Sequence, residues 1–144
     1  MADQAIQSSG QVQDNPTILL VTPEITYLPQ GMGNVADTLK AKAGGLADVS
    51  ASLVSALFSL GADVHVALPH YRRMFDSQIG QVVGDKLSVY KKKLPGSRIH
   101  LAEDRVFYYR DHVYPWGQDD ARNISLAFQR EVLNNIIPWV QPDL

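Results

Sequence analysis

Two short apolar runs, each ended by a proline, constrain the fold of this chain more than any other feature. The first, TILLVT, covers residues 17–22 and stops at Pro23, and the second, ADVHVAL, covers residues 62–68 and stops at Pro69. Continuous apolar runs of this length are typical of parallel strands that are buried on both faces. The sequence therefore predicts a parallel sheet that contains both runs.

The stretch between the two runs predicts the helix that connects them. Apolar residues recur at spacings of three and four over residues 46–60, and Gly61 stands where a left-handed cap would end a helix. The expected apolar stripe consists of Leu46, Val49, Leu53, Ala56, Leu57 and Leu60. A strand, a helix and a second parallel strand form a βαβ unit. We therefore expect an α/β fold, a Rossmann-like parallel sheet with flanking helices.

A long connection precedes this helix. Residues 23–45 lack hydrophobic periodicity and contain several glycines and prolines, which predicts a loop with one helical turn around residues 34–40. Loops of about twenty residues inside a compact domain are usually functional or disordered.

The second half of the chain predicts further strands and a final helix. Residues 81–94 and 99–109 are rich in Val, Tyr and Phe, which predicts one or two hairpins and a strand. A last helix, capped by Asp119 or Asp120, would run to about Ile137, where the next residue is a proline. Its apolar stripe would consist of Ala121, Ile124, Phe128, Val132 and Ile136.

Charge and composition restrict the classes of partner. The formal net charge of -2 shows neither a nucleic-acid footprint nor an acidic tail, and the absence of cysteine fits a reducing compartment. No apolar run approaches the roughly 20 residues that cross a bilayer, and the polar start of the chain is unlike a signal or transit peptide. We therefore expect a soluble, cytoplasmic protein without nucleic-acid or membrane partners, with a flexible tail at residues 1–16 and one folded domain at 17–144.

The stretch KAGGLADV, residues 42–49, is the main candidate for chemistry. Gly44 and Gly45 would let backbone amides approach a ligand at the start of a helix, where unpaired N–H groups and the helix dipole attract anions. Lys42 would add an ammonium group suited to a diphosphate. The alternative is structural: the glycines let the helix start close to the sheet, and Lys42 is a solvated charge.

Further side chains have both a functional and a structural interpretation. Asp48 either stabilises the helix dipole or binds a sugar or the loop, and Glu24 either points into a ligand crevice or caps the loop that follows it. Tyr114 and Trp116 either stack on sugar rings or pack within the protein. His65 has no identifiable partners for a metal, so no metal site is expected.

Three segments together resemble a known family. The order ILLVTPE, KAGGLADV and LGADVHVALPHYR is similar to the amino terminus of bacterial glycogen synthases and plant starch synthases. This resemblance covers about residues 18–72, and a weaker similarity continues in YPWGQDDARNISLAF at residues 114–128.

The resemblance implies the amino-terminal half of a two-domain glycosyltransferase of the GT-B type. Such an enzyme transfers glucose from a nucleotide sugar, usually ADP-glucose, to the end of an α-1,4-glucan with retention of configuration, and no metal or other cofactor is expected. By resemblance, Lys42, Gly44 and Gly45 would contact the donor's phosphates and sugar, and Asp48 would support the loop or the glucose.

Two departures from the family pattern shape the expectation. Residues 25–41 include an insertion of about a dozen residues beside the expected site, and the sequence stops at QPDL, where the family continues into an H-x-H-D-W-like motif and a carboxy-terminal domain. We therefore expect no catalytic residue within this chain, no activity without the missing domain, and exposed apolar surface beside a truncated sheet.

Two other functions remain open at this stage. The chain could be a non-catalytic module that binds glucan or nucleotide. It could also be an unrelated nucleotide-binding domain, although the second strand ends in Leu68, Pro69 and His70 rather than in the acidic ribose ligand typical of that class.

Overall fold

The computed structural model describes residues 15–29, 31–32, 40–75 and 97–144. The strands in this part of the chain form one parallel sheet in the order β1-β2-β3. Strand β1 is Thr17–Val21, β2 is Asp63–Pro69 and β3 is Ile99–Ala102. The two apolar runs are therefore parallel neighbours, as predicted, with Leu19 opposite His65.

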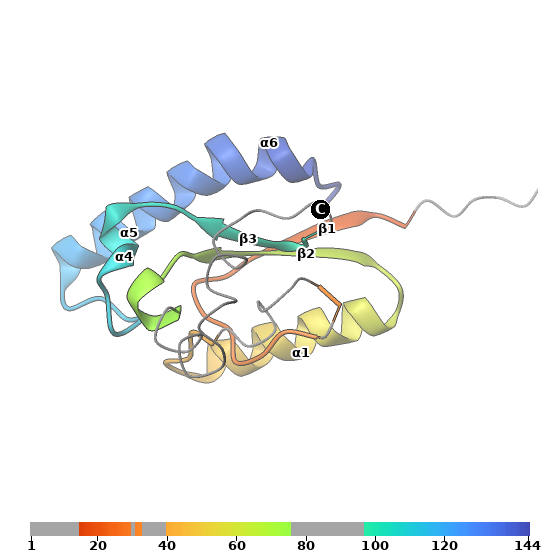
Figure 1. The fold of residues 1–144 in the computed structure, drawn as a ribbon, viewed down its shortest axis with the longest axis horizontal. Coiled ribbons are helices and arrows are strands. Elements are labelled where there is room, and N and C mark those ends of the chain that lie inside the picture. Colours follow the sequence, from red (N-terminus) through yellow and green to blue (C-terminus); the bar gives the residue numbers. More distant parts are fainter. Residues whose placement is uncertain (1–14, 30, 33–39, 76–96) are drawn as a thin grey trace, which may run out of the picture.

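Helices cover both faces of this sheet. Helix α1 (Gly45–Ser59) lies against one face, and the helical stretch that contains α5 and α6 lies against the other (Figure 1). This stretch consists of α5 (Gln118–Glu131), the π-helical turn η3 (Val132–Ile136) and α6 (Ile137–Val140). The predicted Rossmann-like α/β arrangement is confirmed.

Helix α1 ends as the sequence predicts. Gly61 has φ +79°, the left-handed conformation that favours glycine. Its N–H donates to Phe58 O at 3.0 Å, and the N–H of Ala62 donates to Leu57 O at 3.1 Å. These two bonds form a Schellman motif, which satisfies carbonyl groups in the last turn and turns the chain into β2.

The prediction of which face α1 buries is wrong. The buried side chains are those of Ala47, Ser50, Ala51 and Val54, whereas the larger Leu46, Val49, Leu53 and Leu60 are between 45% and 82% exposed. Small side chains at the contact allow the helix axis to approach the sheet closely, and this places the leucines on the flank. Large apolar side chains of α1 are therefore exposed to solvent.

A short helix follows β3 where the sequence favours strands. Residues 105–108 form helix α4 (Arg105–Tyr108), because Asp104 caps it by accepting a hydrogen bond from the N–H of Val106 at 3.0 Å. The prediction of strands over residues 99–109 is therefore right only for β3. The hairpin expected at residues 81–94 lies outside the described residues, as do residues 34–39 of the expected helical turn and residues 1–14 of the expected tail.

The last helix differs from its prediction at both ends. Gly117, not Asp119 or Asp120, occupies the N-cap position of α5. Helical structure continues past Pro138 to Val140, because η3 shifts the hydrogen-bond register just before the proline that lacks an N–H.

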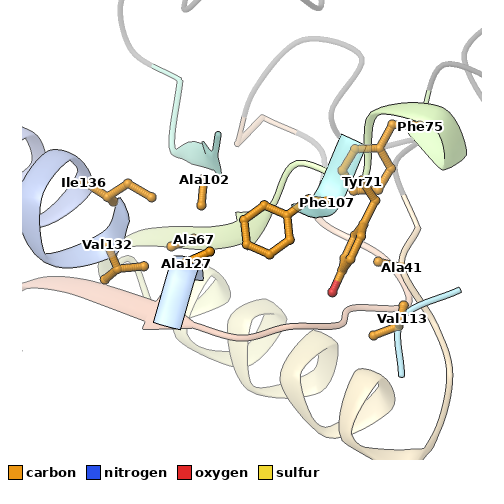
Figure 2. Packing of buried hydrophobic residues seen from close by; sticks show 10 residues of the cluster. All are labelled: Ala41, Ala67, Tyr71, Phe75, Ala102, Phe107, Val113, Ala127, Val132 and Ile136. Carbon is orange, nitrogen blue, oxygen red and sulfur yellow. The ribbon is translucent and has the colours of Figure 1, made fainter. Parts of the chain in front are cut away.

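The core on this face of the sheet confirms most of the predicted stripe. Val132 and Ile136 are buried beside Ala67 of β2 and Ala102 of β3 (Figure 2). The partly buried Ile124 and Phe128 also pack against this cluster. The cluster continues toward the end of the sheet through aromatic side chains, namely those of Tyr71, Phe75 and Phe107.

Strand β1 is flanked on both edges, which determines where a ligand site is expected. One edge pairs with β2, and on the other the N–H of Leu19 donates to Leu144 O at 2.9 Å while the N–H of Leu144 donates to Thr17 O at 3.3 Å. The connections from β1 and from β3 run over opposite faces of the sheet (Figure 1). Beyond the carboxyl end of β1 there is therefore a topological switch point, where α/β proteins bind ligands.

Candidate functional site

The chain leaves β1 in a tight turn that points Glu24 into the protein. Thr22 donates a hydrogen bond from its hydroxyl to Glu24 O at 2.9 Å, and its Oγ1 lies 3.0 Å from the hydroxyl of Ser50 on α1. Glu24 is completely buried at the carboxyl end of β1. A buried carboxylate is stable only where hydrogen-bond donors surround it.

An isolated antiparallel bridge brings the lysine loop back to this point. The N–H of Ile25 donates to Ala41 O at 2.9 Å, and the N–H of Ala41 donates to Ile25 O at 3.0 Å. The two ends of residues 25–41 therefore lie side by side. Residues 42–45 follow directly and lie beside Glu24.

The carboxylate of Glu24 caps this loop. Its Oε2 accepts hydrogen bonds from the N–H groups of Ala43 at 2.8 Å and Gly44 at 3.0 Å, and its Oε1 accepts one from the hydroxyl of Tyr114 at 3.2 Å. Of the two interpretations of Glu24, the structure therefore contains the capping one. The amides of Ala43 and Gly44 are occupied by the protein itself.

The two glycines of the loop have different environments. A Cβ on Gly44 would collide with the hydroxyl of Tyr114, while its φ of -158° is open to any residue. Gly44 is therefore required for the close approach of the tyrosine. A Cβ on Gly45 would meet no atom within 4 Å, so the fold itself leaves free space at this position.

Lys42 and Asp48 form an ion pair at the surface. The ammonium of Lys42 lies 3.0 Å from Oδ1 and 2.9 Å from Oδ2 of Asp48, and Thr26 donates its hydroxyl to Oδ1 at 2.6 Å. The hydrogen bond from Thr26 and then that from Lys42 lower the pKa of Asp48. Half of the Lys42 side chain is exposed, and exposed ion pairs contribute little, so the ammonium can move to another anion at small cost.

The first turn of α1 offers the remaining donors. The N–H groups of Gly45 and Leu46 have no partner within a helix because they precede its first complete turn. No described residue accepts a hydrogen bond from either of them. The amino end of the 15-residue helix α1 thus carries these two amides at an exposed position, and Lys42 lies three residues before Gly45 in the chain.

Only one of the two candidate aromatic side chains joins this site. Tyr114 is half-exposed and reaches Glu24 through its hydroxyl. The Trp116 ring is 82% exposed and stands edge-on to His112, with 4.2 Å between the ring centroids. The structure therefore brings together Glu24, the lysine loop and Tyr114, while Trp116 packs against a different partner.

Arg110 is a residue of the site's surroundings that the sequence did not reveal. It is buried, and its guanidinium donates to Asp120 Oδ1 at 2.9 Å and to the backbone oxygen of Tyr114 at 3.0 Å. Asp120 in turn accepts a hydrogen bond from the N–H of Trp116 at 2.9 Å. No local pattern separates Arg110 from the exposed arginines of this chain, because its burial depends on α5.

The histidines take structural roles. Nδ1 of the buried His70 lies 3.1 Å from a carboxylate oxygen of Glu103, and Nδ1 of His65 lies 2.9 Å from Nε2 of His100. Among the described residues, no group of three or more histidine and carboxylate side chains could hold a metal ion.

The comparison with known families decides the assignment. The model of the starch synthase catalytic domain matches residues 17–144, which include the whole described sheet and the lysine loop. The chain belongs to this family. The fold and the lysine loop are thus those of a starch synthase-type glycosyltransferase domain.

Several curated relatives of this starch synthase-type domain are named glycogen synthases. The protein from Moorella thermoacetica is 34% identical over 139 residues, which are 88% of this chain and 26% of that protein. The protein from Clostridium beijerinckii is 32% identical over 122 residues, covering 72% of this chain and 24% of its own length. The one from Thioalkalivibrio sulfidiphilus is 41% identical over 70 residues, covering 42% and 14%.

The starch synthase-type domain described here is short beside these relatives. The chain spans about a quarter or less of their length. No solved structure is significantly similar to it. Of the helices in the described residues, none has the length and apolar character that a membrane crossing requires.

The contact between Gly44 and Tyr114 gives the first prediction. Gly44→Ala is expected to destabilise the protein by about 1–3 kcal/mol, because the new methyl group overlaps the tyrosine hydroxyl. Adding Tyr114→Phe to this variant removes the overlapping oxygen and should restore part of the loss. Urea denaturation of the two single variants and the double variant measures both effects. Losses that simply add would contradict the proposed cause.

The surroundings of Asp120 predict a pH dependence. The hydrogen bond from Arg110 and then the one from the Trp116 N–H lower the pKa of Asp120. The folded protein therefore holds the Asp120 proton less tightly than the unfolded chain. The resulting stabilisation is complete above the unfolded pKa and is lost as the pH falls through the folded one.

Asp120→Asn should accordingly reduce the loss of stability between about pH 5 and pH 2, measured by urea denaturation at each pH. Asp119→Asn, at a neighbouring side chain that is 92% exposed, is the matched control and should leave the pH profile unchanged. Equal profiles for wild type and Asp120→Asn would refute the assignment.

Proposed function

We propose that this chain is the amino-terminal part of a retaining glucosyltransferase that transfers glucose from ADP-glucose to an α-1,4-glucan in the cytoplasm. Membership of the starch synthase catalytic domain family supports the reaction class. Residues 17–144 would form part of its first Rossmann-like domain, preceded by a tail at residues 1–16. A carboxy-terminal domain would close the cleft and supply the catalytic groups.

The observation that carries this proposal is the free space beside Gly45. It lies at the amino end of α1, where no described residue accepts a hydrogen bond from the N–H of Gly45 or Leu46, and Lys42 precedes it by three residues. The N–H groups of Ala43 and Gly44 already donate to Glu24, so an anion would bind at the first turn of α1 instead. The donor's diphosphate has the charge and size that such a place accepts.

The same groups suit the chemistry of the leaving group. As the bond between glucose and the diphosphate breaks, negative charge grows on the phosphate oxygens. An ammonium that has moved to the diphosphate, together with backbone N–H groups, stabilises that charge more strongly in the transition state than in the bound donor. In this proposal Lys42 moves from Asp48 to the diphosphate, and Asp48, still held by Thr26, keeps the loop in place.

The position of Tyr114 is compatible with a role near the sugar. Its ring is half-exposed next to Gly44, while its hydroxyl is held by Glu24. In this proposal the ring lines the donor site. Trp116 is largely exposed and would contact glucan rather than the diphosphate.

The direct test is ADP binding by this chain, measured by calorimetry at low salt. Lys42→Ala should weaken binding about ten-fold, since it removes one charge-assisted contact. The matched control is Arg105→Ala, which removes an exposed positive charge from α4. Equal affinities of wild type and Lys42→Ala would refute the phosphate role.

Gly45→Ala separates ligand binding from folding. Alanine should stabilise the first turn of α1 by about 0.5–1 kcal/mol, because the fold leaves room for its methyl group. The same methyl group would enter the space assigned to the diphosphate and weaken ADP binding. Thermal unfolding and calorimetry on the same variant measure the two opposite effects. Unchanged ADP affinity would show that the ligand lies elsewhere.

Glucose transfer distinguishes the enzyme from a non-catalytic module that binds nucleotide or glucan. Joined to its carboxy-terminal domain, the chain should transfer labelled glucose from ADP-glucose to glycogen, and Lys42→Ala should lower the rate strongly. ADP binding without transfer in that longer protein would favour the binding module.

A further inference from the structure

A polar network links the start of α5 to the lysine loop across residues that are distant in the sequence. The Arg110 guanidinium donates hydrogen bonds to the Asp120 carboxylate and to the backbone oxygen of Tyr114. The Tyr114 hydroxyl donates to the Glu24 carboxylate. Glu24 in turn accepts hydrogen bonds from the N–H groups of Ala43 and Gly44. Every link is a hydrogen bond between 2.8 and 3.2 Å.

We propose that Arg110 and Asp120 are positioning residues for the lysine loop. They fix Tyr114 so that its hydroxyl orients the Glu24 carboxylate, and this carboxylate sets the path of the backbone from Ala43 into α1. The inference rests on the proposed function in one respect, namely that the loop so positioned binds the donor's diphosphate.

Arg110 is held in one place by its surroundings. Its side chain is 8% exposed, and its guanidinium makes hydrogen bonds in three directions. Besides Asp120 and Tyr114, it donates from Nε to the backbone oxygen of His112 at 3.3 Å. A planar fork with this many partners has one conformation, which a lysine cannot reproduce.

Asp120 binds the segment of residues 110–116 at both of its ends. One carboxylate oxygen binds Arg110, and the other binds the N–H of Trp116. Asp120 lies in the first turn of α5, where the helix dipole favours a negative charge. Tyr114 lies in the chain between Arg110 and Trp116, the two residues bound by Asp120, so α5 determines its position.

The segment that carries Tyr114 is attached to the core independently of the polar network. Val113 is buried in the hydrophobic cluster beneath this segment, so apolar packing already attaches the segment to the domain. The polar network adds the orientation of the following residue. The hydroxyl of Tyr114 has to fall beside Gly44, where there is no room for a Cβ, so small shifts of the segment reach the loop directly.

The position of the Tyr114 hydroxyl affects the orientation of the Glu24 carboxylate. Its Oε1 has only the Tyr114 hydroxyl as donor among the described residues, and its Oε2 has the two loop amides. If the tyrosine shifts, the buried carboxylate rotates to recover a donor. The amides of Ala43 and Gly44 then lose their alignment, and the free amides of Gly45 and Leu46 shift with them.

The experiment compares Arg110→Lys, Asp120→Asn and Tyr114→Phe with wild type. Two readouts are used on each protein: the NMR shift of the Gly44 amide proton, which reports the hydrogen bond to Glu24, and the affinity for ADP. Each variant should move the Gly44 proton upfield and weaken ADP binding about five-fold, the factor that one hydrogen bond of about 1 kcal/mol gives. Arg110→Lys combined with Tyr114→Phe should be no worse than either change alone.

Matched controls distinguish this effect from general loosening. Arg122→Lys alters another arginine–aspartate pair at the start of α5, where the arginine side chain is 67% exposed. Tyr109→Phe removes the hydroxyl of a tyrosine that is 76% exposed. Both controls should leave the Gly44 resonance and the ADP affinity unchanged.

The outcomes separate this inference from the proposed function. An unmoved Gly44 resonance in folded Arg110→Lys or Asp120→Asn, or additive losses in the double variant, would overturn the positioning role. If Arg110→Lys fails to fold, Asp120→Asn and Tyr114→Phe decide the question by the same readouts. If wild type binds no ADP while the variants still show the expected Gly44 shifts, only the donor-site proposal is refuted.

Discussion

The buried carboxylate of Glu24 is the interaction on which the rest of the candidate site depends. It is completely enclosed, so its charge has to be met by donors, and the donors come from the lysine loop and from Tyr114. One side chain thus joins the end of β1, the start of α1 and a segment 90 residues away. This arrangement occupies the amides of Ala43 and Gly44, so neither is available to the ligand proposed for the first turn of α1.

The sheet topology explains why this carboxylate lies where a site is useful. Strand β1 has β2 on one edge and residues 143–144 on the other, and the connections run over opposite faces. In α/β proteins, the carboxyl end of a strand at such a switch point is where ligands bind. The bridge between Ile25 and Ala41 joins the two ends of residues 25–41 next to the lysine loop. Fold and family membership are therefore compatible with one site at this end of the sheet.

The strands and the extent of α1 were predictable because their signals are local. Continuous apolar runs predicted β1 and β2, and Gly61 marked the end of α1. Most of the buried face of α1 was not predictable from hydrophobicity: alanine, serine and valine are buried, and of the predicted leucines only Leu57 packs against the core. Likewise, only the cap formed by Asp104 made a helix of residues that favour strands.

By itself, the sequence determined the strand–loop–helix order and the place of Lys42, Gly44 and Gly45 in it, because these depend on neighbours within a few residues. The tertiary structure alone decided what each of them contacts. It placed Gly44 against the Tyr114 hydroxyl and made the loop N–H groups donate to Glu24. It also paired Lys42 with Asp48 and buried Arg110 against α5. The partners lie between 6 and 70 residues apart, and their geometry exists only once the sheet and its two layers of helices have packed.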